Sequence, residues 1–124
     1  MKLDMNELFI TGRLVRDIEL RQNSNGNSYV WFTLAVNSTI NNGETQTDYL
    51  PCSLWGKAAE LLATFGKKGK RMLITKGKLR SYVKVAEDGT RQSHLYVVIA
   101  SYELMDGLKR EKESGFFESF GEEV

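Results

Sequence analysis

The sequence predicts an all-β fold, in which five strands form a barrel and one helix lies between the third and fourth strands. Three observations support this prediction. Apolar and polar residues alternate over most of the chain, as in strands with one buried face. Asparagine- and glycine-rich turns separate several of the alternating segments. One segment, residues 57–65, changes to the spacing of a helix.

The alternating segments give the expected strands, at residues 7–15 with an extension toward 18–21, at 29–37, 45–55, 71–85 and 94–104. In the first strand, Gly12 would allow a bend or a close backbone approach. Residues 23–28 (NSNGNS) and 87–90 (EDGT) have the composition of turns. Asn42 and Gly43 indicate a tight hairpin between the second and third strands.

The helical segment is KAAELLATF, with an apolar face formed by Ala58, Leu61, Leu62 and Phe65. Gly66 or Gly69 is expected to end this helix. The resulting order of elements, β-β-β-α-β-β, is that of the OB fold, a Greek-key barrel of five strands.

Charge is distributed unevenly along the chain. The net charge is +1, but residues 57–84 contain nine Lys and Arg and one acidic residue, while residues 106–124 contain six acidic and three basic residues. We expect one folded domain at 1–105 and a short, acidic, flexible tail at 106–124. The apolar runs are too short to span a membrane and the first residues lack the apolar core of a signal peptide, so we expect a cytoplasmic protein.

Few residues are candidates for catalysis or metal binding. Cys52, the single cysteine, lies in an apolar alternating run, which favours a buried thiol over a nucleophile. His94 is the single histidine, so a zinc site or a Cys–His pair would lack ligands. Asp17 and Glu19 lie beside arginines, which favours local ion pairs over an acid pair. We therefore expect no enzymatic activity, no metal and no cofactor.

The strand faces opposite the core give the clearest functional signal. On the second and third strands these faces carry Tyr29, Trp31, Thr33 and Ala35, and Tyr49, Pro51, Ser53 and Trp55. On the fourth strand, every second position is a cation or a tyrosine: Lys76, Lys78, Arg80, Tyr82 and Lys84. Phe9, Tyr96 and Tyr102 are assigned to the core or to a subunit interface.

Cations and exposed rings on one surface are suited to an unpaired nucleic-acid strand. Cations contact the phosphates and release counterions, so that affinity depends on salt. Aromatic rings stack on unpaired bases of any sequence, each contributing about 1–3 kcal/mol. A duplex hides the faces of its bases, so it would make little use of these rings. The pattern therefore predicts sequence-independent binding of a single strand.

Several segments resemble the bacterial-type single-stranded DNA-binding protein family. They are TGRLVRDIELR (11–21), SNG (24–26), FTLAV (32–36), TDYLPCSLWGKAAELL (47–62), KKGK (67–70) and KGKLRS (76–81). The resemblance extends over about residues 5–105. It implies an OB-fold protein that coats single-stranded DNA during replication, recombination and repair, usually as a homotetramer.

The resemblance also assigns roles to residues. Trp55 and Tyr49 match base-stacking aromatics, and Arg80 matches a phosphate-contacting arginine. Arg21 closes the E-L-R segment, and Thr33 lies near the implied DNA path. Further along the fourth strand, either Tyr82 or Lys84 occupies an aromatic position of the family. The basic positions around the helix are matched by Lys57, Lys68 and Lys70.

The chain also departs from the family pattern. Ile40 replaces an aromatic residue in the loop between the second and third strands, and Trp31 stands where the family has a small or polar residue. We expect Trp31 to supply a stacking ring in place of the missing one; a role at a subunit interface is the alternative. The acidic end lacks the usual Asp-Asp-x-x-Pro-Phe-like tip, and the compact length suggests a phage- or plasmid-borne member.

The expected function is therefore the binding and protection of single-stranded DNA by a homo-oligomer. The acidic tail would occupy the basic groove in the absence of DNA or recruit replication or recombination proteins. Two alternatives remain at this point: an accessory protein of the primosome or of recombination that acts mainly through protein partners, and an RNA-binding OB domain.

Overall fold

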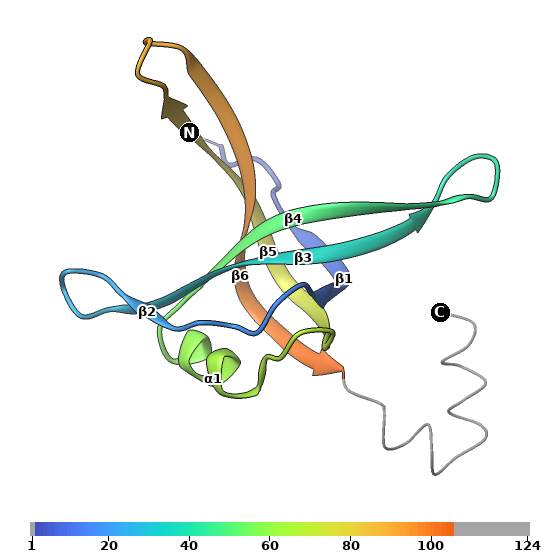
Figure 1. Cartoon of the computed structure of the whole chain (residues 1–124), viewed down its shortest axis with the longest axis horizontal. Coiled ribbons are helices and arrows are strands. Elements are labelled where there is room, and N and C mark those ends of the chain that lie inside the picture. Colours follow the sequence, from blue (N-terminus) through green and yellow to red (C-terminus); the bar gives the residue numbers. More distant parts are fainter. Residues whose placement is uncertain (1, 106–124) are drawn as a thin grey trace.

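Seven elements make up the computed structural model, which describes residues 2–105. They are β1 (Leu8–Leu14), β2 (Arg21–Gln22), β3 (Ser28–Thr39), β4 (Thr45–Trp55), α1 (Lys57–Phe65), β5 (Arg71–Val85) and β6 (Arg91–Met105). The strands pair in the order β1-β5-β6-β4-β3-β2, and a further pairing of β1 with β3 closes the barrel. Helix α1 lies at one end of the barrel (Figure 1). The β2–β3, β3–β4 and β5–β6 hairpins project from the barrel. The predicted OB fold is confirmed.

The predicted extension of the first strand is a separate element, β2. Its two residues pair with β3, where Arg21 lies opposite Tyr29. Before β2 the chain leaves β1 and turns inward, so that Ile18 is buried and its N–H donates to the Gly66 carbonyl at 3.0 Å. The numbering thus places α1 between β4 and β5, although it still follows the third long strand as predicted.

The barrel closes where β1 passes between β5 and β3. Residues Leu8 to Arg13 pair with β5, and Arg13 and Leu14 also pair with β3. A Cβ atom on Gly12 would lie 2.7 Å from the Ala35 carbonyl oxygen and 2.7 Å from the Leu34 Cγ atom. Glycine at this position therefore permits the close backbone approach that closure requires.

An irregularity in β5 determines which face carries the cations. Met72 and Ile74 point into the core, but the register with β6 shifts on both sides of Lys76. Beyond the shift the inward position is Gly77, and the even-numbered residues that follow point outward. Strict alternation from Met72 onward would instead have placed Lys78, Arg80 and Lys84 on the core face.

The core consists of residues from every long strand, from α1 and from the segment between β1 and β2: Leu14, Ile18, Val30, Leu34, Cys52, Leu54, Ala59, Leu62, Met72, Ile74, Val97 and Ile99. The predicted core face of the helix is wrong in part. Ala59 and Leu62 are fully buried, whereas Leu61 and Phe65 are 50% and 56% exposed. Small alanines allow the helix to approach the end of the barrel closely, so the alanine side packs inward.

No helix within 2–105 is long and apolar enough to cross a membrane.

We predict that Gly12→Ala destabilises the protein by about 1–3 kcal/mol, because the added methyl group would overlap backbone as well as side-chain atoms. Gly77→Ala serves as the matched comparison, since its Cβ would meet side-chain atoms of Ile74 and Val97 at 3.1 and 3.3 Å. Urea unfolding should show the larger loss for Gly12→Ala. Equal stability of this variant and the parent protein would show that Gly12 is not needed for closure.

Candidate nucleic-acid interface

The outer face of the β3–β4 ribbon carries exposed aromatic rings. Tyr29 lies opposite Trp55 in the strand register, and their rings stack with centroids 4.8 Å apart and planes inclined by 26°. Trp55 is still 49% exposed, so one of its ring faces remains available. Tyr49 is 65% exposed on the same face of β4, six residues from Trp55 and thus roughly 20 Å away along the strand.

Thr33 lies between these two aromatic positions, opposite Pro51. The assignment of Ser53 to the exposed face is wrong, because Ser53 is buried. It pairs with Trp31 of β3 on one side and with Val98 of β6 on the other, where β4 and β6 run parallel for two residues. The contact between β4 and β6 therefore converts an outward position into an enclosed one.

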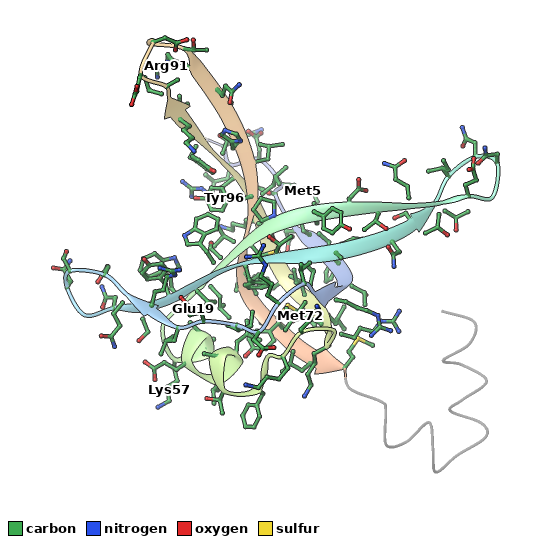
Figure 2. All side chains as sticks on the ribbon, in the orientation of Figure 1. Met5, Glu19, Lys57, Met72, Arg91 and Tyr96 are labelled. Carbon is green, nitrogen blue, oxygen red and sulfur yellow. The ribbon has the colours of Figure 1, made fainter. Side chains whose placement is uncertain are left out.

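A second group of rings lies where the β5–β6 hairpin crosses β3 and β4. Trp31 contacts Tyr96 at a centroid distance of 5.0 Å, and Tyr96 and Tyr82 form a T-shaped pair with centroids 5.7 Å apart. Tyr82 also stacks on His94, with centroids 5.2 Å apart and planes inclined by 24°. Trp31, Tyr82 and Tyr96 line an open hollow of about 350 Å³. Figure 2 shows Tyr96 at the base of the hairpin and Arg91 at its tip.

The three aromatics assigned to core or interface have different environments. Tyr96 is half-buried on the outer face and lines the hollow rather than the core. Tyr102 does pack against the core; its hydroxyl donates to the Ala58 carbonyl at 3.2 Å, and burial raises its pKa. Phe9 is largely exposed and so lies outside the core.

The predicted cations of β5 are all exposed: Lys76, Lys78, Arg80 and Lys84. Beyond the bulge they share the face of Tyr82, with Arg80 opposite Tyr96 and Lys84 opposite Gln92 on β6. None of the four forms an ion pair with another residue in 2–105. Their charge is therefore available to a ligand along the same face as the rings.

Two further predicted cations lie near the Tyr29–Trp55 pair. Arg21 lies opposite Tyr29 on β2 and forms an exposed ion pair with Glu19 at 3.1 Å. Exposed ion pairs of this kind contribute little to stability. A phosphate can therefore replace Glu19 as the partner of Arg21. Lys57 is exposed at the start of α1, two residues after Trp55.

Lys68 and Lys70 lie at the other end of β5 from Tyr82. They precede β5, where the Lys68 N–H donates to Asp17 at 2.8 Å and the Lys70 carbonyl accepts from the Leu14 N–H at 2.9 Å. Tyr82 lies eleven residues beyond the start of β5, on the order of 35 Å along the strand. Their role in binding remains a prediction.

The residues considered for catalysis have structural environments. Asp17 accepts the Lys68 N–H, and Glu19 pairs with Arg21 as expected from the neighbouring arginines. Cys52 is fully buried in the core, and burial raises the pKa of its thiol to about 12. Residues 2–105 contain no group of three or more His, Cys, Asp or Glu placed to hold a metal ion.

The comparison with known proteins gives one family over nearly all of the described residues. A model of the family described as "Single-strand binding protein family" matches residues 5–105. A single-stranded DNA-binding protein of Lactiplantibacillus plantarum is 36% identical over 104 residues, which cover 82% of this chain and 52% of that protein. For its counterpart in Enterococcus faecalis the values are 30% identity over 113 residues, with 90% and 60% coverage.

A third relative is closer in length. Single-stranded DNA-binding protein B of Bacillus subtilis is 34% identical over 109 residues, which cover 86% of this chain and 96% of the relative. The chain thus spans about half to three fifths of the length of the first two relatives and nearly all of the third.

We predict that Cys52 does not react with a thiol reagent such as DTNB in the folded protein at pH 8, because a buried thiol with a raised pKa is neither accessible nor ionised. The same measurement in urea should release one equivalent of product, which provides the control. Rapid reaction of the folded protein would contradict the structural role assigned to Cys52.

Proposed function

Because the chain belongs to the single-strand binding protein family, we propose that it binds single-stranded DNA without sequence preference, keeping it unpaired and protected from nucleases. The process served would be replication, recombination or repair, in the cytoplasm and without catalysis by the protein itself. The observation that carries this proposal is a face on which exposed rings of β3, β4 and β5 lie beside cations of β5 that form no ion pair within residues 2–105.

In this proposal the rings and the cations have separate tasks. Tyr49 and Trp55 stack on bases along the β3–β4 ribbon, and Trp31 and Tyr82 do so at the hairpin crossing. The phosphates are held by the cations, and Thr33 lies along the path between the rings. The proposed cations are Arg21, Lys57, Lys68, Lys70, Lys76, Lys78, Arg80 and Lys84.

The relatives also bear on the choice between functions. Those reported above are named for single-stranded DNA binding, which favours this function over an accessory protein that acts mainly through protein partners. Exposed rings alone would also accept single-stranded RNA, since both nucleic acids present unpaired bases. A comparison of oligo-dT with oligo-U separates these two ligands.

We further propose that the protein acts as a homo-oligomer, and specifically as the homotetramer that the resemblance implies. The side of the β5–β6 hairpin opposite the cations continues past the barrel as an exposed apolar surface formed by Leu79, Val83, Val85 and Leu95. A monomer would leave this surface in water, whereas a second subunit would bury it. The proposed docking of the acidic tail to the basic face or to replication or recombination proteins involves residues 106–124, outside the described part.

We predict that oligo-dT quenches the tryptophan fluorescence and that log affinity falls linearly with log salt concentration. Trp55→Ala should weaken binding by about 1–3 kcal/mol through loss of one stacking ring. Arg80→Gln should reduce the slope of log affinity against log salt concentration by about one, the contribution of one phosphate contact. Phe65→Ala, which removes an exposed ring on α1, is the control and should bind normally. The absence of both quenching and a salt dependence would rule out the proposed function.

We predict that Leu95→Asp lowers the molecular mass measured by light scattering, because a carboxylate would be placed on the proposed subunit interface. Leu61→Asp makes the same change on the exposed side of α1 and should leave the mass unaltered. If the parent protein is a monomer, or if Leu95→Asp retains the full mass, this surface is not the interface.

A further inference from the structure

The group of rings at the hairpin crossing differs from the other exposed rings because it forms a concave surface. Trp31, Tyr82 and Tyr96 come from three different strands and surround a space of about 350 Å³. This volume is at the lower end of the range for small-molecule sites, roughly 300–1,000 Å³. Tyr49, in contrast, is a single ring on the open ribbon.

The walls of the hollow are held in place by their neighbours. One face of the Tyr82 ring is covered by His94, so a flat ligand can stack only on the other face. Tyr96 contacts both Trp31 and Tyr82, and it lies next to Val97, which pairs with Cys52 where β6 meets β4. Trp31 and Tyr82 remain 46% and 44% exposed, so they are accessible to a ligand.

We propose that this hollow is a nucleobase subsite, in which one unpaired base of the bound strand inserts against Trp31 and Tyr82 and rests on Tyr96. The inference rests on the proposed function and adds to it the role of Tyr96 and a recessed mode of binding. Arg80, opposite Tyr96, and Lys84, two residues beyond Tyr82, place cations beside the hollow for the flanking phosphates. A base inserted here contacts several rings, whereas a base on Tyr49 contacts one.

The two tryptophans allow the subsite to be observed separately. In a Trp55→Phe protein, Trp31 is the only tryptophan, and oligo-dT should quench its fluorescence. An abasic deoxyribose-phosphate oligomer of equal length should not quench it, because no base enters the hollow. In this background Tyr96→Leu should weaken binding of oligo-dT about tenfold, while Tyr96→Phe should retain it. Phe65→Leu is the matched control and should have no effect.

The outcomes distinguish the subsite from the function on which it rests. If Trp31 emission does not respond to DNA while Trp55 emission in a Trp31→Phe protein does, the subsite is wrong and the proposed function stands. If neither tryptophan responds, the proposed function itself fails. If Tyr96→Leu lowers the mass by light scattering but leaves affinity unchanged, the three rings form a subunit contact and the subsite is again wrong.

Discussion

The pairing of β1 with both β5 and β3 is the constraint on which the arrangement of this molecule depends. It joins the β5–β6 hairpin to the β3–β4 hairpin and leaves β4 and β6 to meet over a short parallel contact at Cys52 and Ser53. That contact lies directly beside Trp31 and Tyr96 and therefore sets their separation. The aromatic cluster is thus a product of barrel closure, and glycine at position 12 makes the closure sterically possible.

The local parts of the fold could be predicted from the sequence. The bounds predicted for β4, α1 and β5 agree with the structure, because turn residues and a change of period mark their ends. Gly43 and Gly89 adopt the positive φ angles that the predicted turns require. The inward face of α1 is predicted only in part: Leu62 is buried as expected, but apolar periodicity also favours Leu61 and Phe65 and takes no account of the close packing that alanine allows.

The candidate site could be predicted only in part. Alternation along single strands placed Trp31, Tyr49, Trp55 and Tyr82 on exposed faces, and the structure agrees. It could not reveal that Tyr96 joins them, because the meeting of β4 with β6 brings together strands that are distant in sequence. The burial of Ser53 has the same cause. The stacking of Tyr29 on Trp55 depends on the hairpin register, which the Asn42–Gly43 turn fixes but the pattern along one strand does not show.

The register of β1 also has a consequence for the order in which the chain folds. The hairpins β3–β4 and β5–β6 join neighbouring segments across short turns, so they can form early and independently. Leu8 and Gly77, in contrast, are partners that lie 69 residues apart in the sequence. Bringing them together costs loop-closure entropy before any contact of the closed barrel compensates for it. Closure by β1 is therefore expected to be the slow step, and until it occurs the apolar inner faces of both hairpins remain open to other chains.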